Sequence, residues 1–133
     1  MRPKRKPLTE GVKYDTGKTL FSLLPWDAVR DVGEVFTRGA QKYEERNWEL
    51  GMKWSRVFNS TQRHLTDWFQ HRMTYDPDGT GLRNIAQATW GCLVLLAYEL
   101  RSIGTDDRPC GKTSQPISKK NLKPSTPRRK RSS

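Results

Sequence analysis

The sequence predicts an all-α fold: a small helical bundle of about three main helices, followed by a disordered basic C-terminal tail. Residues 26–43 and 54–73 repeat apolar side chains every three or four positions, which is the period of an α-helix. Residues 85–100 are apolar nearly all round, as in a central helix that packs on several sides. The residues after 110 are rich in Ser, Pro and Lys, and too few of them are large and apolar to offset the entropy cost of ordering.

The charge distribution places one domain between two basic ends. The chain has 133 residues, of which 33% are hydrophobic, enough for one domain with a modest core. The net charge of the chain is +11. Residues 1–7 contain four basic side chains, and residues 108–133 contain nine basic side chains and no acid. We therefore expect a flexible leader at 1–10, a near-neutral domain at 11–107 and a disordered tail beyond it.

Neither a membrane span nor a secretory signal is expected. No run reaches the roughly 18 apolar residues that a span needs, and the basic start lacks the apolar stretch of a signal peptide. We therefore expect a cytoplasmic protein with no membrane partner. Cys92 and Cys110 form neither a disulfide framework nor a zinc-ligand spacing, which favours structural roles for both thiols.

The first helix is predicted from Trp26 to about Tyr43. Before it, Gly11 and Gly17 break any sustained period, which indicates a loop that ends in a short apolar anchor. Pro25 then stands where the first turn of a helix tolerates proline. The helical stripe that follows consists of Val29, Val32, Phe36, Ala40 and Tyr43.

Two further helices are predicted, from Trp54 to about Met73 and from about Leu82 to Leu100. Residues 47–53 connect the first two helices, and the Pro and Gly residues of TYDPDGTG require a loop before the third. A bundle this small leaves open that a partner subunit completes its core, which would make the protein a homo-oligomer.

Each of the last two helices carries a polar seam at spacing i, i+3, i+7. Buried polar groups need hydrogen-bond partners, so facing seams would line one polar pocket. The alternative is that these side chains merely bond neighbouring helices. The seams are His64, Asp67 and His71 on the second helix, and Asn84, Gln87 and Gly91 on the third.

Loop residues suggest sites for a metal and for phosphate, and each has a plainer alternative. Asp76 and Asp78 have the spacing of oxygen ligands for a hard divalent cation, although acids in such a loop are often turn formers. Lys13 and Lys18 flank a glycine-containing turn that would suit an anion, but a solvated loop has the same composition. Further candidate cations for phosphate are Lys42 and Arg63.

Four motifs occur in order along the chain: GVKYDTGK…SLLP, RGAQKYEERNW, WSRVFNSTQRHLTDW and DPDGTGLRNIAQATWG…LLAYEL. In that order and spacing they resemble the phage dATP/dGTP diphosphohydrolase domain, over about residues 11 to 101. The resemblance implies hydrolysis of purine deoxynucleoside triphosphates to monophosphate and diphosphate with Mg²⁺ or Mn²⁺. Such an enzyme would reshape the nucleotide pool of a phage-infected host cell, in its cytoplasm.

The site residues are predicted on this basis. Carboxylates would hold the metal that neutralises the triphosphate and orients the attacking water. We expect His64 and Asp67 to be catalytic and Asp76 and Asp78 to hold the metal. An aromatic side chain would stack on the base. The predicted nucleotide- and phosphate-binding residues are Lys13, Asp15, Lys18, Lys42, Tyr43, Asn47, Trp48, Arg63, Asn84 and Gln87.

The chain departs from the family pattern G-L-x-H-L-x-H-A-x-W-N in one segment, residues 81–91. Asn84 and Gln87 replace two histidines, and Gly91 replaces an asparagine. An amide hydrogen-bonds but neither ligates metal nor takes a proton as imidazole does. Two alternatives to an active hydrolase therefore stay open. One is a nucleotide-binding protein without turnover, and the other is a nucleic-acid-binding accessory protein whose basic ends make weak contacts with phosphate.

Overall fold

The structure is a computed structural model that describes residues 7 and 9–109, and the described part is all-helical, which confirms the predicted fold class. The described residues contain two isolated β-bridges and no strand. The predicted tail, the first residues of the leader and Cys110 lie outside this part. The main helices are α1 (Trp26–Lys42), α2 (Trp54–Phe69) and α3 (Asn84–Arg101), and two short 3₁₀ helices are η1 (Phe21–Leu23) and η2 (Asn47–Leu50).

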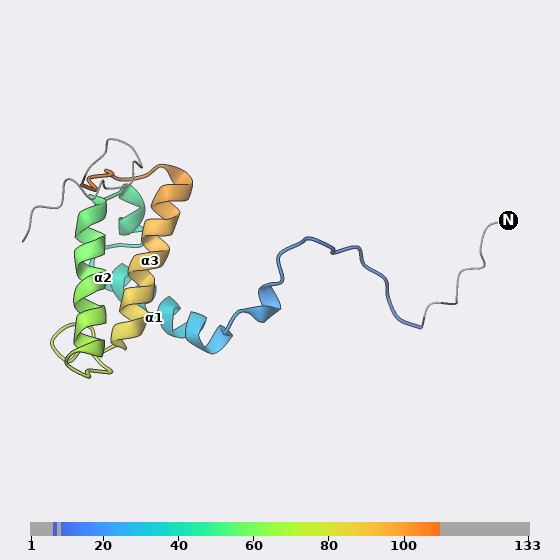
Figure 1. The fold of residues 1–133 in the computed structure, drawn as a ribbon, viewed down its shortest axis with the longest axis horizontal. Coiled ribbons are helices and arrows are strands. Elements are labelled where there is room, and N and C mark those ends of the chain that lie inside the picture. Colours follow the sequence, from blue (N-terminus) through green and yellow to red (C-terminus); the bar gives the residue numbers. More distant parts are fainter. Residues whose placement is uncertain (1–6, 8, 110–133) are drawn as a thin grey trace, which may run out of the picture.

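The helices α2 and α3 form an antiparallel hairpin, and α1 crosses one side of it (Figure 1). Residues 9–24 extend away from the bundle as an arm. An ion pair of 3.5 Å between Arg83 Nε and Asp31 Oδ2 joins α1 to the residue before α3, but both side chains are half exposed, so its contribution is small. None of the described helices has the length and apolarity to cross a membrane.

A small core of Val57, Val94 and Tyr98 lies between α2 and α3. Each such side chain stabilises the fold by roughly 1.5–3 kcal/mol relative to an exposed one. The Tyr98 hydroxyl is polar, and it donates a 2.6 Å hydrogen bond to the carbonyl oxygen of Trp48. Burial raises the pKa of Tyr98 above its usual value, because the charged form is poorly solvated there. This contact ties η2 to the core.

Two glycines allow close approaches that a side chain would block. A Cβ at Gly91 would lie 1.9 Å from Thr61 Oγ1, so α3 passes α2 more closely than any larger residue allows. Gly104 has a φ of 77°, and a Cβ there would lie 2.4 Å from the carbonyl oxygen of Met52. The second approach lets residues 103–107 return along the start of α2.

Residues 103–107 form hydrogen bonds with the first two residues of α2. Trp54 Nε1 donates to the carbonyl oxygen of Ile103 at 2.9 Å. The Asp107 carboxylate accepts the backbone N–H of Ser55 at 2.8 Å and also the Ser55 hydroxyl. Since Lys53 offers no capping side chain, Asp107 satisfies a free N–H at the start of α2 from a distant part of the chain.

The structure differs from the sequence prediction in two details. The helix α2 ends at Phe69 rather than near Met73, because Arg72 adopts a left-handed φ of 53°. The helix α3 is not enclosed on every side, because its outward face leaves Leu93, Leu96 and Leu100 exposed. A three-helix bundle has no fourth element to cover that face.

Candidate functional site

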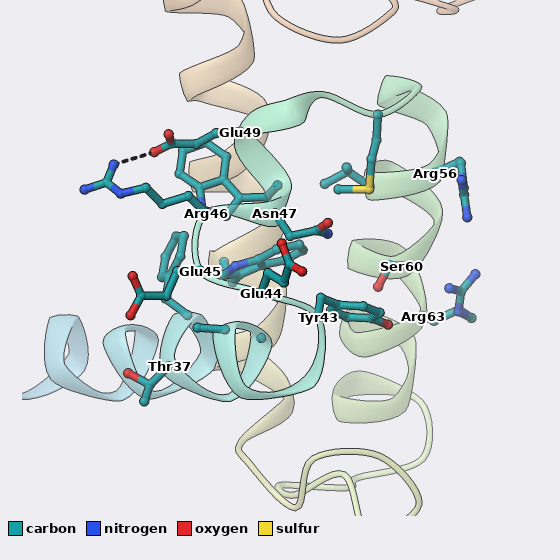
Figure 2. Close-up of a pocket in the computed structure, with 17 residues that line it drawn as sticks. Thr37, Tyr43, Glu44, Glu45, Arg46, Asn47, Glu49, Arg56, Ser60 and Arg63 are labelled. Atoms are coloured by element: carbon teal, nitrogen blue, oxygen red, sulfur yellow. Dashed lines mark hydrogen bonds and ion pairs between the residues drawn. The ribbon is translucent and has the colours of Figure 1, made fainter.

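An open pocket of about 980 Å³ lies between the end of α1, the helix η2 and the first half of α2 (Figure 2). Its volume lies near the top of the range of about 300–1,000 Å³ for small-molecule sites. Four of the predicted nucleotide-binding residues line it: Tyr43, Asn47, Trp48 and Arg63.

The floor of the pocket is aromatic. The ring centroid of Phe36 lies 6.0 Å from that of Trp48 and 6.1 Å from that of Trp90. Two contacts fix Trp48. The Tyr98 hydroxyl donates a hydrogen bond to its backbone carbonyl, and the Arg101 guanidinium lies 5.5 Å from its ring centroid. A fixed aromatic surface of this kind suits a flat aromatic ligand.

One edge of the pocket is basic. Arg56, Ser60 and Arg63 line it from α2 at spacing i, i+4, i+7. Both arginines project from the same side of the helix (Figure 2). Within the described residues, neither forms an ion pair with a carboxylate. Arg63 was predicted from the sequence and Arg56 was missed, although their spacing of seven residues, two turns of a helix, was a signal that could have found it.

Three glutamates also line the pocket, in different environments. Glu49 is paired, since its Oε1 lies 2.9 Å from Arg46 Nη1 and 3.6 Å from Arg101 Nη1. The Glu44 carboxylate turns toward the middle of the pocket, whereas that of Glu45 points to the other side of the loop (Figure 2). Glu44 is therefore the carboxylate best placed to meet a cation that accompanies a ligand.

Asn84 and His64 bring the two predicted polar seams into contact. Asn84 Nδ2 donates to the carbonyl oxygens of Met73 at 2.9 Å and Tyr75 at 3.2 Å, so its Oδ1 is the atom 2.9 Å from His64 Nδ1. An amide oxygen only accepts, so Nδ1 of His64 carries the hydrogen. Nε2 of the neutral ring is then left as an acceptor. Asn84 is fully buried with all its amide groups used, and its predicted role toward a nucleotide stays a prediction.

The other predicted seam and metal residues lie around the loop before α3. Gln87 Nε2 lies 3.4 Å from Asp76 Oδ2, and Asp76 Oδ1 accepts the N–H of Gly79 at 3.1 Å. Asp76 thus has the contacts of a turn residue, while Asp78 is exposed. Among the described residues, no three His, Cys, Asp or Glu side chains gather closely enough to hold a metal ion on their own.

The remaining predicted residues lie apart from the pocket lining. Lys13, Asp15 and Lys18 are exposed on the arm, which extends away from the bundle (Figure 1). Lys42 places its Nζ 5.1 Å from the centroid of the Tyr43 ring. Asp67 is half-buried on α2, three residues after His64. The structure therefore brings the aromatic and arginine candidates together and leaves the arm lysines elsewhere.

Fold and pocket together define a class of protein: an all-α domain with an open pocket that combines an aromatic floor with an edge of guanidinium groups, which form no ion pair within the described residues. The protein family described as dATP/dGTP diphosphohydrolase, N-terminal, matches residues 9–108. The chain belongs to this family, as its motifs predicted. No curated protein and no solved structure matches the chain.

Proposed function

We propose that this protein hydrolyses dATP or dGTP to the monophosphate and diphosphate with Mg²⁺ or Mn²⁺, and that the pocket between α1, η2 and α2 binds the nucleotide. The observation that carries the proposal is that one pocket has both an aromatic floor and two arginines, which form no ion pair with any carboxylate in the described part of the chain. The description of the family, dATP/dGTP diphosphohydrolase, supports the choice of substrate class. The role would be in the nucleotide pool of a phage-infected cell.

The base would lie on the aromatic floor. A purine is flat and polarisable, and a fixed tryptophan such as Trp48 offers it a stacking surface at little entropy cost. Asn47 stands beside Trp48 in the pocket lining, and an amide presents a donor and an acceptor to the edge of a purine. This arrangement supports preference for a purine over a smaller pyrimidine.

The triphosphate would lie along the basic edge. Guanidinium groups bind phosphate oxygens through paired N–H donors, which makes Arg56 and Arg63 the natural clamp. Mg²⁺ is bound in many sites by one or two carboxylates together with substrate phosphates, so Glu44 would hold an ion that arrives with the nucleotide. Such an ion, when bound, neutralises phosphate charge and lowers the pKa of a bound water.

His64 is the base that this chain supplies. Asn84 fixes the ring with Nδ1 protonated, which leaves Nε2 to accept a proton from the attacking water. His64 follows Arg63 directly on α2, one turn after the pocket residue Ser60. Asp67 stays the second predicted catalytic group.

Nucleotide binding without turnover is the second candidate. It is favoured by the absence, in the described part of the chain, of a cluster of three metal-ligating side chains. Asn84 and Gln87 also stand where the family pattern quoted above has histidines. Nucleic-acid binding through the basic ends stays a prediction, because those ends lie largely outside the described residues.

The test is to incubate the purified protein with each of the four dNTPs and Mg²⁺ or Mn²⁺ and to separate the products. We expect dAMP or dGMP with diphosphate, and a much slower reaction with the pyrimidine substrates. Thermal stabilisation by a nonhydrolysable dATP or dGTP without product would favour the binding protein, since a ligand of the native state raises stability. If the protein forms no product and is not stabilised by the nucleotide, both candidates are excluded.

A further inference from the structure

The short helix η2 brings Trp48 into the lining of the proposed nucleotide pocket, and its backbone has two anchors of its own. The buried Tyr98 hydroxyl donates a 2.6 Å hydrogen bond to the carbonyl oxygen of Trp48. Gly51 follows η2 with a φ of 89°, and a Cβ there would lie 2.8 Å from the backbone nitrogen of Gly104. Only a residue without a side chain allows this approach. The backbone of η2 is therefore held independently of its exposed side chains.

Arg101 contacts the ring of Trp48 although it does not line the pocket. Its guanidinium carbon lies over the indole, 5.5 Å from the ring centroid. Arg101 is the last residue of α3 and is absent from the pocket lining, whereas Trp48 belongs to it. A cation over an aromatic ring occupies that face, because it is attracted by the ring electrons. A flat base in the pocket is therefore left with the other face of Trp48.

Glu49 fixes the position of this guanidinium group. Its Oε1 lies 3.6 Å from Arg101 Nη1 and 2.9 Å from Arg46 Nη1, and its side chain is only 27% exposed. Figure 2 shows the contact with Arg46. The planar guanidinium of an arginine can pair with a carboxylate and stack on an aromatic ring at the same time, which the ammonium of a lysine does less well. Glu49 and Arg101 thus connect η2 with the end of α3 beside the Trp48 ring.

The contacts of Arg101 are weak individually, and this determines what they can do. An ion pair or a cation–π contact near the surface contributes little to stability, and the Arg101 side chain is 53% exposed. Loss of Arg101 therefore leaves η2 folded, since its backbone keeps the anchors at Tyr98 and Gly51. The ring of Trp48 then samples more orientations. A ligand that needs one of them binds with an apparent affinity reduced by the fraction of time that the ring spends in it.

We infer that Arg101 is a positioning residue for base recognition, which acts through Trp48 and has Glu49 as its partner. It holds the indole so that one face is presented to a purine in the pocket. The inference rests on the proposed nucleotide site and concerns only the end of that site where the base binds. The proposed phosphate clamp, Arg56 and Arg63, belongs to a different helix, α2, and does not depend on Arg101.

The experiment compares two ligands of the full chain. One is dATP or dGTP, whichever the wild type hydrolyses faster, and the other is inorganic tripolyphosphate, a competitor that has phosphates but no base. In Arg101→Met the KM of the nucleotide should rise about fivefold, as the loss of a surface cation–π contact and an ion pair implies. The kcat and the inhibition constant of tripolyphosphate should stay within about twofold, because only base binding is weakened. Arg38→Met, the same change at an exposed position of α1 outside the pocket lining, should alter none of the three.

Circular dichroism must show that Arg101→Met keeps the helical content of the wild type, and Arg101→Gln takes its place if it does not fold. An unchanged KM in the folded variant overturns the inference. Equal rises in the KM and in the inhibition constant of tripolyphosphate also overturn it, because a general distortion of the pocket weakens both ligands. A wild type that hydrolyses no nucleotide rejects the proposed function, and the role of Arg101 with it, whereas a normal wild type beside an unaffected variant rejects only the role of Arg101.

Discussion

Asn84 shows how one buried side chain joins three parts of the molecule. Its amide bonds the carbonyl oxygens of Met73 and Tyr75 and the ring of His64. The amide thereby holds the loop before α3 and also orients the histidine that we propose as the base. The sequence predicted that Asn84 would meet His64 only if the two polar seams faced each other, and the partners of Asn84 in the loop depend on a turn geometry that periodicity does not report.

Replacing Asn84 with Ala should lower the free energy of unfolding by about 2–4 kcal/mol, because two backbone carbonyls and one imidazole N–H lose their partner. Urea denaturation measures the change. Asn59→Ala, at an exposed position of α2, is the matched control and should stay within about 0.5 kcal/mol of the wild type. Equal effects of the two variants would contradict the role given to the Asn84 amide.

The same contact predicts the tautomer of His64. In the neutral form of the ring, nitrogen-15 chemical shifts should show the proton on Nδ1 and a lone pair on Nε2. In Asn84→Ala the acceptor is gone, and this preference should disappear. A wild-type spectrum with the proton on Nε2 would rule out the arrangement that leaves Nε2 free for the attacking water.

At the scale of elements, the hairpin of α2 and α3 depends on the contact between Thr61 and Gly91. Gly91→Ala should cost about 1–3 kcal/mol of stability through overpacking, despite the better helix propensity of alanine. In the double variant Gly91→Ala with Thr61→Ala, the loss of Thr61 Oγ1 makes room for the new Cβ. The double variant should therefore be less destabilised than the sum of the two single variants. A double-mutant cycle measures the coupling, and additive effects would show that the two residues do not compete for space.

Asp107 caps α2 from the far end of the described chain. The hydrogen bonds from the Ser55 hydroxyl and backbone hold the pKa of Asp107 below its usual value. A depressed carboxyl pKa contributes stability that is complete above about pH 4, the unfolded pKa, and is lost as the pH falls through the lower folded value. The melting temperature of Asp107→Asn should therefore lie below that of the wild type at neutral pH, and the gap should close on acidification below pH 4. A gap independent of pH would argue against the cap.

At the scale of the whole molecule, the pocket exists only because α1, η2, α2 and α3 each contribute to it. Replacing Arg56 with Gln should raise the KM for dATP or dGTP about tenfold or more, as the loss of a charge-assisted contact of roughly 1.5–3 kcal/mol implies. Steady-state kinetics give the value, with Arg38→Gln on α1, outside the pocket lining, as the control. An unchanged KM in Arg56→Gln would remove this arginine from the proposed phosphate clamp.

The sequence by itself determined the three helices, the loops between them, the basic ends and the family, because helical period, Pro and Gly signals, charge and motif order are all local or linear properties. Tertiary structure alone decided that Arg56 and Arg63 line the same pocket as Trp48, that Asn84 bonds both the loop and His64, and that one face of α3 is left open. Those outcomes depend on how far each helix is rotated about its axis and on what lies across from it. Contacts between residues distant in sequence set both quantities, and such contacts leave no periodic trace along the chain.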